Sequence, residues 1–219
     1  MAITENDWND GRAWTDERDG MTRWLAYAGI AGMVALSVTM LIADVVVPNH
    51  DWMSDTISDL AAGRHELLLD TGMYLLAFGT VALAVAAGHV HLGGKGWSMG
   101  VWLLMALALL IFWIGARDEY GDGDSEGVTF HLWLVGGLYA AMAVAPWAMS
   151  AGAGRVEPWL RTALRATTVA WVPLAPLFFV VPDAWDGAYE RFLGLILFAF
   201  LGLLATAFLI RVRRGHGTA

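Results

Sequence analysis

Six apolar runs separated by short polar segments constrain the fold of this chain more than any other feature. A helix needs about 20 apolar residues to cross the roughly 30 Å hydrocarbon core of a bilayer, and each run is close to that length. Because lipid offers the backbone no hydrogen-bond partner, a segment that crosses it must pair its own N–H and C=O groups, as a helix does. The predicted spans are about residues 24–47, 67–90, 97–116, 128–149, 164–181 and 192–210.

The composition is typical of a protein whose surface faces lipid. Of the 219 residues, 58% are hydrophobic and only 16% are charged, whereas about 25% are charged in a soluble domain. The short connections favour antiparallel neighbours, so we predict an all-α, polytopic membrane protein with six transmembrane helices in one antiparallel bundle. Residues 1–23 are expected to form a polar, acidic N-terminal tail, residues 24–210 the transmembrane domain, and residues 211–219 a short basic C-terminal tail.

Small residues and prolines inside the spans predict local packing. Small side chains let helices approach closely, and a proline removes one backbone hydrogen bond of a helix and kinks it. Pro173 and Pro176 therefore predict a kink in the fifth span. Close helix approaches are predicted at Ala28, Gly32, Gly72, Gly79, Gly136, Gly137, Gly194 and Gly202.

Lysine and arginine predict the orientation in the membrane, since they concentrate in cytoplasmic segments. With the N-terminus inside, ten of the 13 Lys and Arg residues fall on the cytoplasmic side, and only Arg64, Arg117 and Arg191 fall outside. We therefore expect a multi-pass protein of the cell (inner or plasma) membrane with both termini in the cytoplasm. Tryptophans such as Trp52 and Trp159 lie near the predicted ends of spans, where indoles prefer the membrane interface.

A Ser-Asp repeat follows the first span, in the sequence SDTISDL. If this stretch is helical, Ser54 aligns with Ser58 and Asp55 aligns with Asp59, because residues four apart share a helix face. Two hydroxyls would then lie beside two carboxylates. An alternative is that Thr56 and Asp59 form a capping pair that only starts a short interfacial helix.

Further polar residues collect on the predicted outer side, and ionisable groups at membrane depth mark a functional site or a paired network. His131 begins the fourth span and is a candidate general base or metal ligand. Ser54 or Ser58 could be the nucleophile that it activates, and Ser58 and Asp59 join His131 as the catalytic candidates. The candidate ligand-binding residues, in which arginines would hold a phosphate or carboxylate group, are Asp55, Arg117, Glu190 and Arg191.

Several classes of function are disfavoured. The net charge of −8 and the lack of a basic stripe disfavour nucleic-acid binding. The chain has no cysteine, which excludes disulfides and thiolate metal sites. The metal and the cofactor, if any, are left open by the sequence.

Short motifs resemble the bacterial and archaeal membrane family known as domain of unknown function 998. They cover most of residues 24–210, although Ile114–Arg117 replaces the Phe-Pro expected after the third span and the N-terminal tail is extra. The resemblance implies a fold and no particular activity, and it places the shared motif residues on the outer face. These motifs are Ser58-Asp59-Leu60, Gly72, the acidic loop before His131, and Tyr189-Glu190-Arg191.

Two functions from different classes follow. In the first, an outward-facing polar pocket binds a lipid head group or a cation, with hydrolysis as a further step. In the second, the chain is a non-catalytic accessory subunit of a larger membrane complex, because no complete catalytic motif is present. Membrane lipids are the expected partners, and a homo-oligomer and a larger complex are both left open.

Overall fold

Six long helices form the computed structural model, which describes residues 12–60, 66–116 and 125–216. No strand occurs in these residues, which confirms the predicted all-α class. The elements in chain order are α2 (Arg12–Val46), α3 (Ile57–Leu60), α4 (Glu66–Val90), α5 (Lys95–Gly115), α6 (Ser125–Val156), α7 (Pro158–Leu174), the 3-10 helices η1 (Ala175–Val180) and η2 (Asp183–Trp185), and α8 (Asp186–His216).

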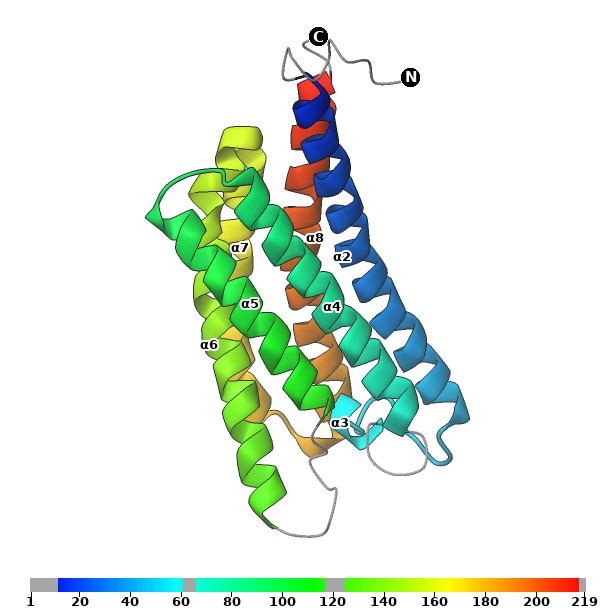
Figure 1. Cartoon of the computed structure of the whole chain (residues 1–219). Coiled ribbons are helices and arrows are strands. Elements are labelled where there is room, and N and C mark those ends of the chain that lie inside the picture. Colours follow the sequence, from blue (N-terminus) through cyan, green and yellow to red (C-terminus); the bar gives the residue numbers. More distant parts are fainter. Residues whose placement is uncertain (1–11, 61–65, 117–124, 217–219) are drawn as a thin grey trace.

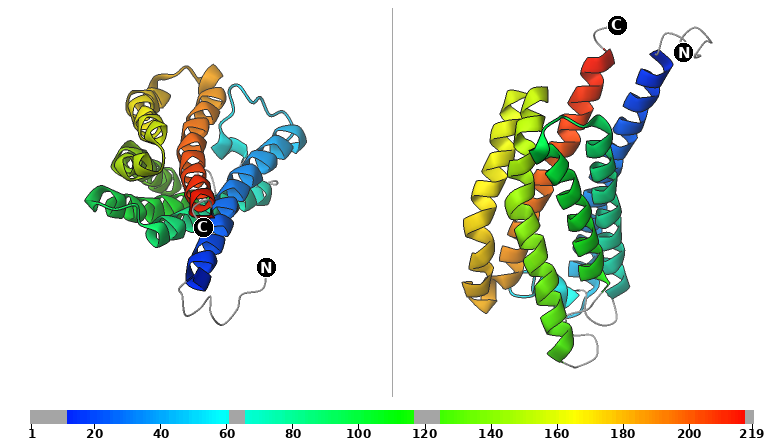
Figure 2. Two further views of the ribbon diagram at one scale, coloured as in Figure 1. Left: turned by 90° about the horizontal axis from the view of Figure 1, so that it is seen from above. Right: turned by 60° about the vertical axis from the view of Figure 1, so that its left-hand side comes forward.

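The helices run up and down beside one another (Figure 1). Contacts follow the chain order from α2 to α4, α5, α6 and α7, and α8 then packs against both α2 and α7. Helix α8 lies between α2 and α7 and also touches α4 and α6 (Figure 2). The start of α2 and the end of α8 lie together at one end of the bundle, which we call the terminal end (Figure 1). The opposite end, which carries α3, η2 and the first turn of α8, is called the α3 end.

Six helical segments are long and apolar enough to cross a membrane, as predicted. They are Arg18–Val46, Glu66–Val90, Lys95–Gly115, Phe130–Val156, Pro158–Val180 and Asp183–Arg214. Helix α2 already begins at Arg12, inside the segment expected to be a tail. The last helix likewise continues beyond residue 210, to His216.

The fifth span changes helix type at its prolines. Helix α7 contains Pro173 and ends at Leu174, and the chain continues as the 3-10 helix η1 through Pro176. Pro176 has no backbone N–H and cannot continue the α-helical hydrogen-bond pattern. The chain therefore switches to the tighter 3-10 form at these prolines, and the kink itself stays a prediction.

Helices α2 and α4 pack backbone against backbone at glycines. A Cβ atom added at Gly32 would lie 2.6 Å from the carbonyl oxygen of Leu75 and 3.3 Å from the Cα of Gly79. A Cβ atom at Gly79 would lie 2.9 Å from the carbonyl oxygen of Ala28. These contacts confirm the close approach predicted for these residues, which small side chains permit.

Three other predicted contact glycines have open space around them. A Cβ atom at Gly136, Gly194 or Gly202 would meet no other atom within 4 Å. The prediction of close helix approach at these three residues is therefore wrong. Helix spacing depends on the whole facing surface, which the composition of one helix does not reveal.

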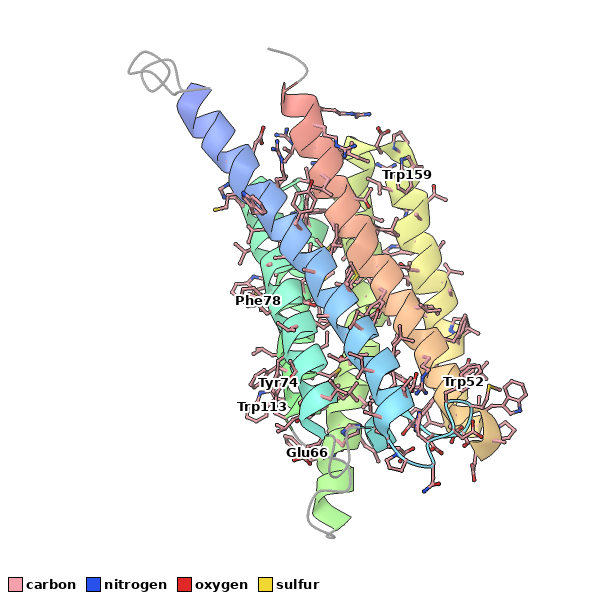
Figure 3. The ribbon with its side chains drawn as sticks, turned by 90° about the vertical axis from the view of Figure 1, so that its right-hand side faces the viewer. Trp52, Glu66, Tyr74, Phe78, Trp113 and Trp159 are labelled. Atoms are coloured by element: carbon pink, nitrogen blue, oxygen red, sulfur yellow. The ribbon has the colours of Figure 1, made fainter. Side chains whose placement is uncertain are left out.

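Aromatic side chains mark the two ends of the bundle. Figure 3 shows Trp159 near the terminal end and Trp52 at the α3 end, and both side chains are about half exposed. This placement agrees with tryptophans at the two membrane interfaces.

The glycine contact yields a first prediction. Changing Gly32→Ala should destabilise the protein by about 1–3 kcal/mol, because the added methyl group meets backbone atoms that move only with the whole of α4. Thermal unfolding in mild detergent measures the change. The control is Gly136→Ala, which has free space and should not lower the melting temperature. Equal melting temperatures for the two variants would contradict the prediction.

Candidate functional site

Arg191 joins three separate segments at the α3 end. Its Nη2 atom lies 2.9 Å from Oδ1 of Asp44 at the end of α2. Its Nη1 atom donates to the carbonyl oxygen of Asp55 at 2.9 Å and to that of Gly187 at 3.0 Å. Only 13% of the Arg191 side chain is exposed. The first turn of α8 is thereby fixed to α2 and to the loop before α3.

His50 lies between two carboxylates in the same network. Its Nε2 atom is 3.0 Å from Oδ1 of Asp44, and its Nδ1 atom is 3.3 Å from Oδ2 of Asp55. Arg191 Nη2 lies 3.2 Å from the same Nε2 atom. The imidazole is 3% exposed, so His50 belongs to a packed polar network and not to a solvated loop.

Asp55 holds its own loop in shape through its carboxylate. Oδ2 accepts a hydrogen bond from the backbone N–H of Asp51 at 2.8 Å, and Oδ1 accepts one from the Ser54 hydroxyl at 3.0 Å. The Asp51 N–H above all, together with Ser54, His50 and Arg191, holds the pKa of Asp55 below its usual value, although partial burial opposes this. The carboxylate is therefore ionised at neutral pH.

Helix α3 begins with a reciprocal cap. Asp59 Oδ2 accepts from the backbone N–H and the hydroxyl of Thr56 at 2.7 and 2.8 Å, and the Thr56 hydroxyl accepts from the Asp59 N–H at 3.1 Å. The capping alternative from the sequence is confirmed. Because α3 covers only Ile57–Leu60, Ser54 and Asp55 precede the helix. The continuous helical ledge of Ser and Asp residues expected from the repeat is therefore wrong.

A cavity of about 410 Å³ lies inside the bundle and reaches the α3 end. Most of its lining is apolar and comes from α2, α4, α5, α6, η1 and α8. The charged and hydrogen-bonding side chains near the α3 end of the lining are Thr56, Ser58, His131, Asp186, Glu190 and Arg191. The cavity is thus apolar over most of its length and polar at one end.

The cavity collects some of the predicted site residues and leaves others outside. Ser58, His131, Glu190 and Arg191 all line it, and His131 is buried. Asp59 does not line it, since its carboxylate caps α3 and the residue is exposed. Asp55 contacts Arg191 from outside the lining, and Arg117 lies outside the described residues. The catalytic and ligand-binding roles given to these residues remain predictions.

Three residues of this region were not among the predicted site residues. Asp44 and His50 bind Arg191, and Asp186 lines the cavity. A signal for Asp186 existed in the sequence: Asp186, Glu190, Leu193 and Leu197 repeat at helical spacing, so they share one face of α8. No comparable local signal links Asp44 to Arg191, which are 147 residues apart.

Among the polar atoms of the residues that line the cavity, one of Asp186 and one of Arg191 have no hydrogen-bond partner among the described residues. They are Oδ1 of Asp186, an acceptor, and Nε of Arg191, a donor, and both are buried. Buried polar groups normally have partners, and leaving one without a partner costs about 1–3 kcal/mol. Both atoms are therefore suited to meet groups of a bound molecule.

No group of three or more His, Cys, Asp or Glu residues suited to a metal ion occurs in residues 12–60, 66–116 and 125–216. Within that part of the chain, four carboxylates of the α3 end are bound instead to Arg191, His50, backbone N–H groups and the Thr56 hydroxyl: those of Asp44, Asp55, Asp59 and Glu190. These groups therefore form an intramolecular network of hydrogen bonds and ion pairs.

A family model described as "Protein of unknown function (DUF998)" matches residues 29–207. The chain belongs to the DUF998 family. The resemblance seen in the sequence is thereby confirmed, and the match extends from α2 to α8 and includes the whole cavity lining. No curated protein and no solved structure matches the chain.

The Arg191 network yields a second prediction. Arg191→Gln should destabilise the protein by roughly 3 kcal/mol, because the change leaves the partly buried Asp44 carboxylate without its cation. The control is Arg214→Gln at the terminal end, where Arg214 pairs with Glu157 but is 58% exposed. An exposed pair contributes about 0–1 kcal/mol. Unfolding in detergent mixtures measures the stability of both variants, and a larger loss of stability for Arg214→Gln would contradict this role of Arg191.

A third prediction concerns pH. Because the folded-state pKa of Asp55 lies below its ordinary value of 3.8, its contribution to stability is present above that value and is lost as the pH falls through the lower, folded-state pKa. Asp55→Asn should lower the melting temperature at neutral pH. It should also flatten the fall in melting temperature between about pH 5 and pH 3 relative to the unchanged protein. Parallel acid profiles for the two proteins would contradict this role of Asp55.

Proposed function

We propose that this DUF998 protein binds an amphipathic membrane lipid in the cavity, with the head group at the α3 end. One observation carries the proposal: the face of α8 that lines the cavity changes from charged to apolar along its length. Asp186 and Glu190 come first, and Leu193 and Leu197 follow one and two turns later. A molecule that lies along this face would meet carboxylates at one end and hydrocarbon at the other.

The size and the lining of the cavity support the same proposal. A volume of about 410 Å³ falls within the range of about 300–1,000 Å³ that is common for ligand pockets. Apolar side chains from several helices surround its middle, among them Met73 of α4, Ile111 of α5 and Phe178 of η1. A purely polar solute would leave this lining without a matching surface.

The α3 end is proposed to face outward, with both termini in the cytoplasm. The support is the distribution of Lys and Arg residues along the chain, because cytoplasmic loops carry the excess of positive charge. The proposed membrane is the cell (inner or plasma) membrane.

The absence of native cysteine makes the orientation directly testable. Single substitutions Trp52→Cys and Arg213→Cys place one thiol at each end of the bundle, and both side chains are exposed. A membrane-impermeant maleimide applied to intact cells should label the first variant and not the second. Labelling of Arg213→Cys alone would reverse the proposed orientation.

A second candidate function is hydrolysis of the bound lipid. The observation that favours it is that Ser58 and His131 line the same polar end of the cavity. His131 would accept the hydroxyl proton while Ser58 Oγ attacks an ester carbonyl, and would pass the proton to the departing alcohol oxygen as the ester C–O bond breaks. Water would then hydrolyse the acyl group from Ser58 and release the fatty acid. Asp59 is already engaged in the cap of α3 and is left out of this scheme. Release of fatty acid from added phospholipid, abolished by Ser58→Ala, tests this function.

Filling the cavity yields a fourth prediction. Gly194 lines the cavity and has free space around it, so Gly194→Leu should place a side chain where the lipid lies. Native mass spectrometry of protein released from its own membranes should then detect less co-purified lipid than in the unchanged protein.

The matched control is Gly202→Leu, which is on the same helix, has equal free space and does not line the cavity. It should retain the bound lipid. Equal lipid occupancy in the two variants would overturn the proposed function. Masses dominated by other polypeptides would favour the accessory-subunit alternative instead.

A further inference from the structure

We propose that the preferred ligand is a phospholipid whose head group carries a protonated primary amine next to its phosphate, as in phosphatidylethanolamine. This inference rests on the lipid-binding function proposed above and specifies the head group. It follows from the charge of the polar end, from the unpartnered atoms of Asp186 and Arg191, and from the way the cavity meets the membrane.

The first step concerns charge. Asp186 and Glu190 line the cavity, and Arg191 is the only Lys or Arg among the described lining residues. The Arg191 guanidinium is already paired with Asp44 and lies beside His50. The polar end therefore carries excess negative charge, and a head group with only a negative charge would be repelled from the carboxylates. A head group with a cationic part is favoured.

The second step concerns hydrogen bonds. Oδ1 of Asp186 is a buried acceptor without a partner among the described residues, so it suits an ammonium N–H donor. Nε of Arg191 is a buried donor without such a partner, so it suits a phosphate oxygen. A phosphoethanolamine group supplies both an N–H donor and a phosphate acceptor. A choline group has a positive charge but no N–H donor, so it would leave the Asp186 oxygen unsatisfied.

The positions of these residues fit the order of groups in the lipid. Asp186 is in the first turn of α8, and Arg191 follows one turn later, toward the apolar part of the cavity. In a phospholipid the phosphate lies between the amine and the acyl chains. The amine would therefore lie beside Asp186, the phosphate beside Arg191, and the chains beside Leu193 and Leu197.

The third step concerns access. Leu132, Phe179 and Leu195 line the cavity, yet they are 49%, 61% and 64% exposed. They belong to α6, η1 and α8, within the segments long and apolar enough to span a membrane. The cavity therefore opens sideways through apolar residues. Acyl chains can extend through this opening into the bilayer, which favours a membrane lipid over a water-soluble phosphoethanolamine.

The test compares binding of three phospholipids with equal acyl chains to the delipidated full-length protein. The probes are phosphatidylethanolamine, phosphatidylcholine and phosphatidylglycerol, and native mass spectrometry measures the bound fraction. Phosphatidylethanolamine should bind about tenfold more tightly than phosphatidylcholine, because one charged hydrogen bond is gained. Equal binding of these two lipids, or tighter binding of phosphatidylglycerol, would overturn the head-group assignment.

Variants and a soluble probe sharpen the result. Asp186→Asn should remove the preference for the ethanolamine lipid, whereas Asp183→Asn should keep it, because Asp183 is exposed and does not line the cavity. Free phosphoethanolamine should displace bound phosphatidylethanolamine poorly. If it competes as strongly as the lipid does, the ligand is not required to be a membrane lipid and this part of the proposal is overturned. The ranking of the three lipids by the unchanged protein tests the assignment even if a variant does not fold.

The two proposals fail in different ways. If the head-group assignment alone is wrong, phosphatidylethanolamine is not bound more tightly than the other two lipids, and Gly194→Leu still lowers the binding of all three. If the lipid-binding function is wrong, Gly194→Leu and Gly202→Leu bind every lipid equally well.

Discussion

The α3 end of this DUF998 protein depends on one partly buried ion pair, between Arg191 of α8 and Asp44 of α2. The two residues are 147 positions apart, and the same guanidinium also binds two backbone carbonyl groups. Breaking a buried pair by removing one partner leaves an uncompensated charge, so such a pair fixes geometry even where its net contribution to stability is small. Through this pair, the first turn of α8 and the loop that leads into α3 keep their positions at the end of the cavity.

Glu190 extends the same arrangement by one residue. Its Oε2 atom accepts a 2.6 Å hydrogen bond from the backbone N–H of Ile57, which is one of the unpaired donors at the start of α3. Neighbouring residues of α8 thus hold the loop from two sides: Arg191 binds its carbonyl group at Asp55, and Glu190 binds its N–H group at Ile57. Asp186 lies one turn earlier, and its buried Oδ1 atom has no hydrogen-bond partner among the described residues. Asp186 is therefore suited to bind a ligand, whereas Glu190 and Arg191 hold the fold.

The fold could be predicted from the sequence further than the site could. Spans of about 20 apolar residues fix helices in lipid, and prolines such as Pro176 mark where a helix changes form, since both effects are local along the chain. The cap of α3 was readable for the same reason, because Thr56 and Asp59 are three residues apart. Which carboxylates bind arginine and which line the cavity depends on contacts between distant segments. Asp44 and His50 could therefore not be assigned, and Gly194 was expected in a helix contact although it faces open space.

The tight contact between α2 and α4 has a mechanical consequence for the cavity. Gly32 and Gly79 bring the two backbones together, so this side resists displacement in the way a close-packed solid does. Another part of the cavity wall contains η1, a 3-10 segment with weaker hydrogen-bond geometry than an α-helix. The cavity thus has one stiff wall and one compliant wall. Any change in its volume would fall on the segment that carries Phe178 and Phe179, and the frame that holds Arg191 would stay in place.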